Sequence, residues 1–289
     1  MPENQTLSWT DIQLRRLREL NADPALLAAR FDHAAVRDRA YQKLERDLVV
    51  KAREGLEALR VKRLRPRLSR LEERLCRVLK DQGFVQVATP ILMSRGLLAK
   101  MTVDAGNPLY EQVFWVDARR CLRPMLAPHL YYILKDLLRL WPKPVRIFEV
   151  GPCFRKETAG GRHAEEFTML NLTEFGLPED QRHSRISELA ALIADAAGLK
   201  AYELVSEPSA VYGDTIDIEV ADPETGERKL EVGSAAMGPH PLDRPWRIAE
   251  TWVGIGFGLE RLLLAAEGYS HLAMAGRSLS YLDGYRLNV

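Results

Sequence analysis

The sequence predicts an α+β fold in which helices flank an antiparallel β-sheet and further helices precede it at the N-terminus. Residues 145–174 show two runs of β-forming residues around a charged loop, the pattern of a β-hairpin. Residues 202–236 contain further short strands joined by turns, and residues 10–80 have mainly helical patterns. Strands that pair through hairpins indicate an α+β fold rather than a doubly wound one.

The composition is that of an ordinary globular protein, with 46% hydrophobic and 28% charged residues in a chain of 289. This length allows one large core, or one core with a smaller appendage. No run of eighteen apolar residues occurs, which excludes a transmembrane helix. The first residues lack a secretory signal pattern, and three widely spaced cysteines suit a reducing compartment. We therefore expect a cytoplasmic protein with no membrane partner.

The N-terminal part is predicted to form consecutive helices. Thr10 is placed to cap a first helix that ends near Leu20, and Pro24 to start another. A long charged helix is expected over 31–59 and an amphipathic one over 60–80. The apolar face of the amphipathic helix is a row of leucines three or four residues apart: Leu64, Leu68, Leu71, Leu75 and Leu79.

Charge is distributed unevenly along the chain. Residues 1–80 hold 19 Lys and Arg against 12 Asp and Glu, a net of +7, whereas the remainder has a net of −6. This asymmetry suggests that the N-terminal part faces nucleic acid, although solvated faces of charged helices explain it equally well. We expect a helical region at 1–60 that faces nucleic acid and a separate, more acidic domain at 61–289.

The next segment is predicted to contain short strands and one amphipathic helix. Residues 84–87 alternate like a strand, and 114–117 and 121–124 are predicted to be two short strands around a turn. A helix is expected from Ala127 to about Leu140, and further on another over 180–198. In the first of these helices one face carries four apolar residues, which core packing explains as readily as a binding pocket: Ala127, Leu130, Tyr131 and Leu134.

A strip of glycines follows near the C-terminus. Gly254, Gly256 and Gly258 alternate with apolar residues, which leaves one face of a strand free of side chains. A flat ligand can lie against such a face. Arg261 opens the helix that follows, and the spacing of the glycines differs from the dinucleotide-binding fingerprint. The alternative is a strand that packs closely against its neighbours.

The hairpin and the glycine strip together point to a nucleotide. Arg155 is suited to bind the α-phosphate in a bidentate manner, through two N–H groups of its guanidinium. Phe167 and Arg261 are suited to stack on opposite sides of an adenine. Glu231 and Ser234 would reach one face of their strand only through a local irregularity, and there they would hold Mg²⁺. An exposed glutamate beside a buried serine is the competing interpretation of that pair.

These residues resemble the motifs of class II aminoacyl-tRNA synthetases. Residues 154–157 with Phe167 resemble the second motif of that class, 254–261 the third, and Thr89 with Pro90 the first. Longer segments resemble one family in particular, the pyrrolysyl-tRNA synthetases, in the bacterial form whose catalytic subunit is a separate chain. The segments are LRPMLAPHLYYILKDL at 122–137, HAEEFTMLNLTE at 163–174, VYGDTID at 211–217 and GFGLERLL at 256–263. The resemblance extends from about residue 8 to Val289, and it implies a helical tRNA-binding region at 1–60 and a class II catalytic domain at 61–289.

The resemblance implies a set of site residues. Asn171 would bind the amide carbonyl of the substrate side chain, and Tyr212 would cover the pocket. The amino-acid pocket would be lined by Ala127, Leu130, Tyr131, Leu134, Asn171, Thr173, Tyr212 and Trp252, with Met237 or Ala236 at its floor. ATP would be bound by Arg155, Glu157, His163, Phe167, Glu231, Ser234, Gly256 and Arg261, among which Arg155, Glu157 and Arg261 are catalytic and Glu231 and Ser234 hold Mg²⁺. His129 departs from the family pattern, in which this position is usually Asn.

The resemblance also implies a reaction and its partners. Pyrrolysine, or an Nε-acyl-lysine analogue, would be activated with ATP and transferred to the 3′ end of a cognate amber-suppressor tRNA. The chain would form a homodimer through the region around 83–90, and a separate small basic tRNA-binding protein would be a further partner. Two alternatives remain: a related adenylating ligase for another amino acid or acceptor, and a tRNA-binding homologue without catalytic activity.

Overall fold

The computed structural model describes residues 6–156, 164–209, 211–222 and 229–289. Its centre is a seven-stranded sheet in the order β1-β4-β5-β9-β8-β7-β6. The strands are β1 (Val85–Gln86), β4 (Val145–Phe154), β5 (Glu166–Phe175), β6 (Glu203–Ser209), β7 (Gly213–Ala221), β8 (Lys229–Gly238) and β9 (Trp252–Gly258). The neighbouring pairs are antiparallel apart from β1 and β4, which run parallel. The predicted α+β architecture is confirmed, with this one parallel pair added at the edge.

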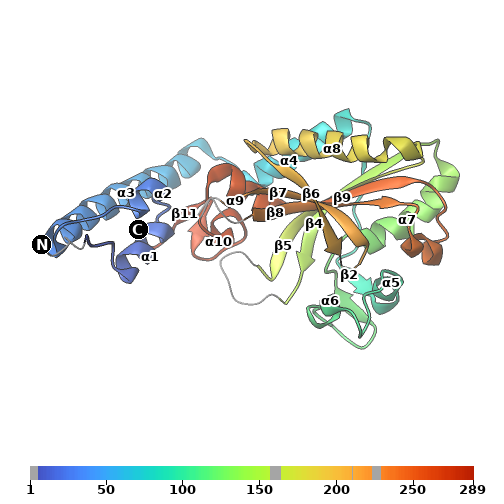
Figure 1. The fold of residues 1–289 in the computed structure, drawn as a ribbon, viewed down its shortest axis with the longest axis horizontal. Helices are drawn as coiled ribbons and strands as arrows, with labels where there is room; N and C mark the ends of the chain where they lie inside the picture. Colours follow the sequence, from blue (N-terminus) through green and yellow to red (C-terminus); the bar gives the residue numbers. More distant parts are fainter. Residues whose placement is uncertain (1–5, 157–163, 210, 223–228) are drawn as a thin grey trace, which may run out of the picture.

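Helices cover one face of the sheet (Figure 1). These are α4 (Arg67–Asp81), α8 (Arg182–Ala197) and α9 (Leu259–Glu267). Alternation along β9 turns Val253, Ile255 and Phe257 towards them, and all three side chains are buried. Of the apolar row predicted for the 60–80 segment, Leu71, Leu75 and Leu79 are fully buried in the same core, whereas Leu64 lies before α4 and is exposed. The helical periodicity in the sequence therefore identified this layer correctly.

A smaller cluster of elements lies against the other face. It contains α5 (Arg95–Lys100), α6 (Pro108–Glu111), α7 (Ala127–Leu140) and a two-stranded sheet of β2 (Leu92–Ser94) and β3 (Arg120–Leu122). The predicted strand at 114–117 is wrong, because Trp115 makes only an isolated bridge to Cys121. Cys121 pairs instead with Met93 of β2, a strand too short to show alternation in the sequence.

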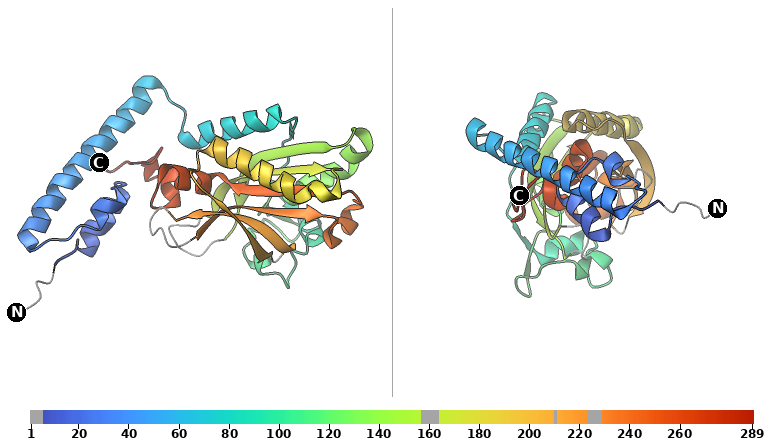
Figure 2. Two further views of the ribbon diagram at one scale, coloured as in Figure 1. Left: turned by 45° about the horizontal axis from the view of Figure 1, so that its top comes forward. Right: turned by 90° about the vertical axis from the view of Figure 1, so that its left-hand side faces the viewer.

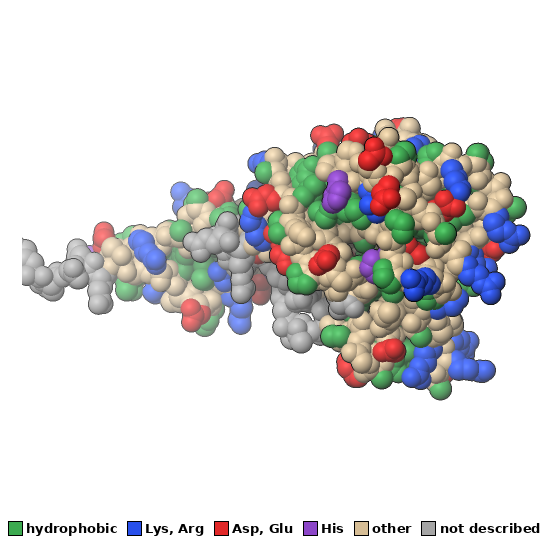
Figure 3. Space-filling view, turned by 45° about the vertical axis from the view of Figure 1, so that its right-hand side comes forward, with side chains coloured by type: hydrophobic (Ala, Val, Ile, Leu, Met, Phe, Trp, Pro, Cys, Tyr) green, Lys and Arg blue, Asp and Glu red, His purple; other side chains and the backbone are tan. Residues whose placement is uncertain are grey.

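The N-terminal helices form an arm beside the body (Figures 2 and 3). They are α1 (Asp11–Glu19), α2 (Pro24–Leu27) and α3 (Ala34–Lys62), and they share a small core around Trp9, Leu17 and Ala22. The Thr10 cap and the start at Pro24 are confirmed. A single helix over 60–80 is wrong, because Arg63 takes a left-handed conformation and Pro66 precedes α4.

The C-terminal residues join the arm to the body. They comprise α10 (Leu272–Ala275) and the short strands β10 (Tyr281–Leu282) and β11 (Tyr285–Arg286), and two 3₁₀-helices lie earlier in the chain, η1 (Glu179–Gln181) and η2 (Pro241–Trp246). Asp283 pairs with Arg67 at the start of α4, and Arg16 of α1 donates to Asn288. Within the described residues, none of the helices combines the length and apolar content needed to cross a membrane.

A buried ion pair lies on the face of the sheet opposite α4, α8 and α9. Arg123 donates to Glu149 of β4 at 2.6 Å, and both side chains are 2% exposed. Glu149 also accepts from the backbone N–H and the hydroxyl of Thr89, at 3.0 and 2.7 Å. The Arg123 guanidinium extends across Gly151, where a Cβ atom would lie 2.2 Å from its Nη2. The glycine is therefore what leaves space for the ion pair.

We predict that Gly151→Ala lowers the free energy of unfolding by about 2–4 kcal/mol, because the added methyl group displaces a buried, ion-paired guanidinium. Chemical denaturation of the purified protein measures this difference. The matched control is Gly96→Ala in α5, where a Cβ atom meets nothing within 4 Å. Equal stability of the two variants would contradict the prediction.

Candidate active site

A cavity of about 350 Å³ lies on the face of the sheet opposite α4, α8 and α9. The register of β5 and β9 sets Gly254, Gly256 and Gly258 directly opposite Thr173, Asn171 and Met169. Paired residues project from the same face of a sheet, so three positions without side chains border three positions with them. The glycine strip predicted from the sequence is thus part of the cavity wall, and it provides the empty volume.

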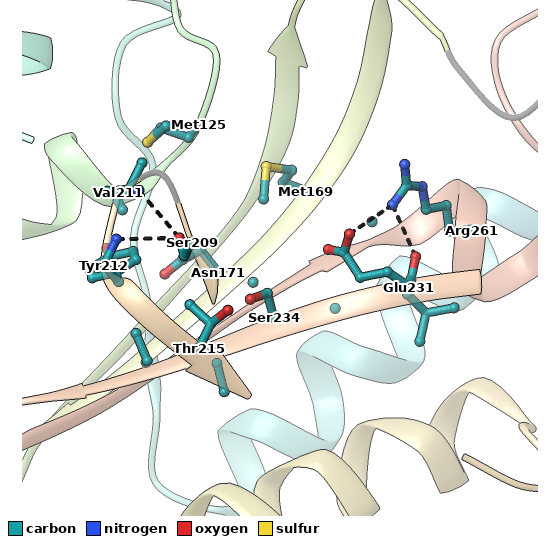
Figure 4. A pocket seen from close by; sticks show the side chains of 18 of the residues that line it. Met125, Met169, Asn171, Ser209, Val211, Tyr212, Thr215, Glu231, Ser234 and Arg261 are labelled. Carbon is teal, nitrogen blue, oxygen red and sulfur yellow. Dashed lines mark hydrogen bonds and ion pairs between the residues drawn. The ribbon is translucent and has the colours of Figure 1, made fainter. Parts of the chain in front are cut away.

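The two arginines of the predicted nucleotide site lie at one end of this cavity (Figure 4 shows Arg261). Arg261, in the first turn of α9, donates to the Glu231 carbonyl oxygen at 3.0 Å and approaches its carboxylate at 3.5 Å. The Nε of Arg155 donates to the Pro124 carbonyl oxygen at 2.9 Å, and its guanidinium carbon lies 5.3 Å from the centroid of the Phe167 ring. The structure therefore brings together residues from β5, β8, α9 and the position after β4 that are suited to phosphates and a base.

A bulge in β8 supplies the local irregularity that the pair Glu231 and Ser234 requires. Ile218 pairs with Gly233 whereas Glu219 pairs with Glu231, so Val232 is an extra residue in β8. Both Glu231 and Ser234 consequently line the cavity (Figure 4). Burial raises the pKa of the Glu231 carboxyl, and the nearby Arg261 opposes this shift.

The donor set of this pair suits Mg²⁺ bound to phosphates. Among the described residues, no group of three or more His, Cys, Asp and Glu side chains is placed to enclose a metal ion. Mg²⁺ is commonly bound through one or two protein oxygens, with phosphate oxygens and water as its other ligands. Two oxygens from the Glu231 and Ser234 side chains fit that type of site.

The other end of the cavity is aromatic with a few polar groups. Tyr131, Trp252 and Tyr212 lie together there, with the Tyr131 and Trp252 rings 5.8 Å apart and nearly perpendicular. Burial raises the pKa of both tyrosines well above the ordinary value, so both hydroxyls keep their protons at neutral pH.

Two polar atoms at this end have no hydrogen-bond partner among the described residues. They are Oδ1 of Asn171 and Oγ1 of Thr173, both buried. An unsatisfied buried polar atom costs about 1–3 kcal/mol, so such atoms in a cavity wall indicate a polar group of a ligand. A ligand with an apolar body and an amide group would match this end of the cavity.

The structure places most of the predicted site residues in the cavity wall, with some exceptions. Leu130 and Leu134 are fully buried in the core behind the wall rather than among the lining residues. Ala236 lines the cavity, whereas Met237 packs against the helix-covered core. Glu157 and His163 lie outside the described residues. The lining residues that sequence analysis did not identify include Leu109, Met125, Met169, Ser209, Val211 and Thr215.

Of these additional residues, Met169 was recoverable from the sequence. It follows the same alternation as Phe167, Asn171 and Thr173 along β5. The others named here come from α6, from the segment before α7 and from the β6–β7 hairpin, whose position over the cavity depends on the pairing of distant strands. No local pattern marks them.

The fold is that of a class II aminoacyl-tRNA synthetase. Residues 114–266 match a family model described as tRNA synthetase class II core domain (G, H, P, S and T). Over 139 residues, 46% of this chain, the sequence is 27% identical to histidine–tRNA ligase from Leptospira biflexa. The match covers 32% of that ligase, so the chain spans about a third of the length of such curated relatives.

Two solved structures are similar over the whole chain. A pyrrolysyl-tRNA synthetase from Desulfitobacterium hafniense is 51% identical, with a TM-score of 0.89 over 98% of this chain and 99% of that one. A second structure of a pyrrolysyl-tRNA synthetase from the same organism is 50% identical, with a TM-score of 0.88 over 100% and 99%. The chain belongs to the pyrrolysyl-tRNA synthetase family, as the sequence motifs predicted.

His129 lies in the first turn of α7 beside the buried ion pair. Its Nδ1 is 3.2 Å from the Thr89 hydroxyl, and the side chain is mostly buried. Burial and the nearby Arg123 lower the pKa of His129, an effect that Glu149 partly opposes. The folded protein therefore resists protonation of this ring.

We predict that His129→Asn makes the free energy of unfolding less dependent on pH between about 7 and 5. An unfolded histidine takes up a proton near pH 6.5. Because the folded state resists that proton, stability should fall as the pH falls through this range in the wild-type protein. Denaturant titrations at pH 8 and pH 5.5 measure the change. His183→Asn, on the exposed side of α8, is the control, and the same pH slope in all three proteins would contradict the prediction.

Proposed function

We propose that this chain is a pyrrolysine–tRNA ligase. It activates pyrrolysine with ATP to the aminoacyl-adenylate and transfers the acyl group to the 3′ end of a cognate amber-suppressor tRNA. The main support is the similarity of at least 50% identity over essentially the whole chain to pyrrolysyl-tRNA synthetases. The cavity has a charged end and an aromatic end, which suit a nucleotide and a long, weakly polar side chain.

In this proposal the charged end binds ATP. Arg155 binds the α-phosphate, while Phe167 and Arg261 hold the adenine and the triphosphate. Glu231 and Ser234 hold Mg²⁺, which when bound neutralises phosphate charge, and Gly256 leaves the backbone open to the ligand. Glu157 and His163, which lie outside the described residues, are assigned to the same nucleotide.

The reaction requires positioning and charge stabilisation rather than an enzyme nucleophile. The substrate carboxylate attacks the α-phosphorus, a bond to the carboxylate oxygen forms, and pyrophosphate leaves. Arg155 stabilises the negative charge that develops on the α-phosphate oxygens, and Arg261 fixes the triphosphate in line. A guanidinium held through Nε by the Pro124 carbonyl needs little reorganisation during this step.

The aromatic end of the cavity binds the amino-acid side chain. Trp252, Tyr131 and Ala127 form apolar walls, and Tyr212 covers the substrate. Asn171 bonds the side-chain amide, and Thr173 lies beside it. Walls of this kind select mainly by size, so the polar contact with Asn171 supplies discrimination against side chains that lack an amide.

The proposed partners rest on the surface of the arm and on one sheet edge. Exposed basic side chains on α3 and in the connection to α4 favour contact of the region 1–60 and its continuation with a tRNA backbone. These side chains are Arg53, Arg60, Lys62, Arg63 and Arg65.

A homodimer through 83–90 is proposed because Val85 and the following Ile91 and Leu92 expose apolar side chains near the edge strand β1. A separate small basic protein is proposed as a second tRNA-binding partner, and a cytoplasmic location is favoured by three free thiols.

We predict that the pure protein charges its cognate tRNA with pyrrolysine or an Nε-acyl-lysine analogue and not with phenylalanine. Radiolabelled aminoacylation measures this directly, and Arg155→Ala is expected to lower the rate by about a hundredfold or more. Charging with phenylalanine instead would favour the alternative ligase. Binding of tRNA without any charging would favour the non-catalytic homologue.

We predict that Asn171→Ala admits bulky aromatic amino acids, because the substitution removes the amide that rejects them and enlarges the cavity. ATP–pyrophosphate exchange should become detectable with phenylalanine, and exchange with the Nε-acyl-lysine should fall about tenfold or more. Gln42→Ala, which removes an exposed amide from α3, is the control. An unchanged substrate range would remove Asn171 from its proposed role.

We predict that affinity for tRNA falls about a hundredfold or more between 50 and 200 mM salt, since phosphate contacts release counterions. Filter binding or fluorescence anisotropy measures the dissociation constant. Lys62→Ala should reduce the salt dependence, whereas Lys200→Ala, in the exposed connection between α8 and β6, should not. A dissociation constant that is independent of salt would refute the contact.

A further inference from the structure

A buried carboxylate, Asp243 of η2, lies behind the aromatic end of the cavity and is not among the residues that line it. Its side chain accepts hydrogen bonds from the Tyr131 hydroxyl at 3.3 Å, the Trp252 indole N–H at 2.9 Å and the His240 backbone N–H at 2.7 Å. Asp243 is 3% exposed, and within the described part of the chain no Lys, Arg or His side chain forms an ion pair with it. Its charge is therefore stabilised by three N–H and O–H donors, two of them from the cavity walls.

Such a carboxylate is costly to bury, and an apolar residue would pack there at lower cost. What the carboxylate adds is a fixed orientation of the Trp252 ring. Rotation about the Cβ–Cγ bond allows two opposite orientations of the indole, and the hydrogen bond to Asp243 selects the one that turns the indole nitrogen away from the cavity. Gly238 supports this orientation, because a Cβ atom at that position would lie 1.9 Å from the Trp252 indole nitrogen.

The orientation of Trp252 determines which part of the indole faces the ligand. With the nitrogen bonded to Asp243, the six-membered ring is the part near the glycine strip, since a Cβ atom on Gly254 would lie 3.4 Å from its Cζ3 atom. The Tyr131 ring is held at the same time, stacked on Trp246 at 5.5 Å and perpendicular to Trp252. One carboxylate thus fixes two walls relative to each other.

The turn that carries Asp243 also holds the third aromatic wall. The Nδ1 atom of His240 accepts from the Leu242 N–H, so the ring proton is on Nε2. Nε2 then donates at 2.9 Å to the backbone carbonyl oxygen of Tyr212, the residue proposed to cover the cavity. Asp243 fixes the start of this turn through the His240 N–H, which connects all three walls to one residue.

We propose that Asp243 is a positioning residue for amino-acid specificity: it holds Tyr131, Trp252 and, through His240, Tyr212 at the separation that accepts an Nε-acyl-lysine side chain. This inference rests on the proposed function, because that function supplies the substrate. Asp243 touches no reacting atom, so its effect should be on binding of the amino acid and not on the chemical step.

The test is ATP–pyrophosphate exchange by Asp243→Asn with an Nε-acyl-lysine such as Nε-Boc-lysine. The amide oxygen can still accept from the Trp252 and His240 N–H groups, which share Oδ2 of Asp243, so the N–H₂ group turns towards Tyr131. The Tyr131 hydroxyl then loses its acceptor, and its hydrogen bond breaks or reverses. We expect KM for the amino acid to rise about tenfold while kcat and the KM for ATP change by less than about twofold. Asp180→Asn, an exposed aspartate in the other 3₁₀-helix, is the matched control and should leave all three constants unchanged.

A double-mutant cycle separates positioning from a general loss of structure. Tyr131→Phe removes the donor that has lost its acceptor, so in that background Asp243→Asn should raise KM only about twofold. If Asp243→Asn alone fails to fold, the double variant is compared with Tyr131→Phe alone, and a large further rise in KM there refutes the proposal. An unchanged KM in Asp243→Asn, or the same rise in both backgrounds, also refutes it.

The same measurements distinguish this inference from the proposed function. A wild-type protein without exchange for pyrrolysine or any Nε-acyl-lysine would overturn the proposed function, and the positioning role with it. A wild-type protein that is active, together with an Asp243→Asn variant that has unchanged constants, would overturn the positioning role alone.

Discussion

The backbone register between β5 and β9 is the constraint on which the site depends. It sets the three glycines of β9 opposite Met169, Asn171 and Thr173, and the next register along the sheet sets Ser234 opposite Gly256. A shift by one residue would turn the buried row of β9, including Ile255, towards the cavity and the glycines towards the helices. The empty volume and the core are therefore two results of the same hydrogen-bond pattern. The register also brings the residues proposed to bind phosphates and those proposed to bind the amino-acid side chain onto one face.

Buried polar groups around the cavity serve to hold its walls. Arg123 and Glu149 form an ion pair next to the row that contains Asn171, and Asp243 accepts from two aromatic walls. Removing a single member of such a network leaves a charge or a donor without a partner, which makes each network intolerant of change. Asn171 and Thr173 differ from these groups, because both residues line the cavity while Oδ1 of Asn171 and Oγ1 of Thr173 have no hydrogen-bond partner among the described residues.

Sequence patterns predicted the elements that have strong local periodicity. The hairpin of β4 and β5, the helices α7 and α8, and the glycine strip of β9 all lie where the sequence placed them. The errors occur where the pattern is short or ambiguous: a three-residue strand at Leu92–Ser94 was missed, and the leucine row of α4 did not reveal the break at Arg63. On α7, core packing and pocket lining produce the same apolar face, so Leu130 could not be distinguished from Tyr131.

The sequence by itself determined the family, the α+β class and the motif residues, because these depend on residue identity and on spacing within single elements. Only the tertiary structure decided which side chains share the cavity and which residues support them. Tyr131 and Asp243 are 112 positions apart, and Arg123 and Glu149 are 26 apart on different elements. Contacts of this kind are set by strand register and by the packing of helices on the sheet, and neither leaves a periodic signal along the chain.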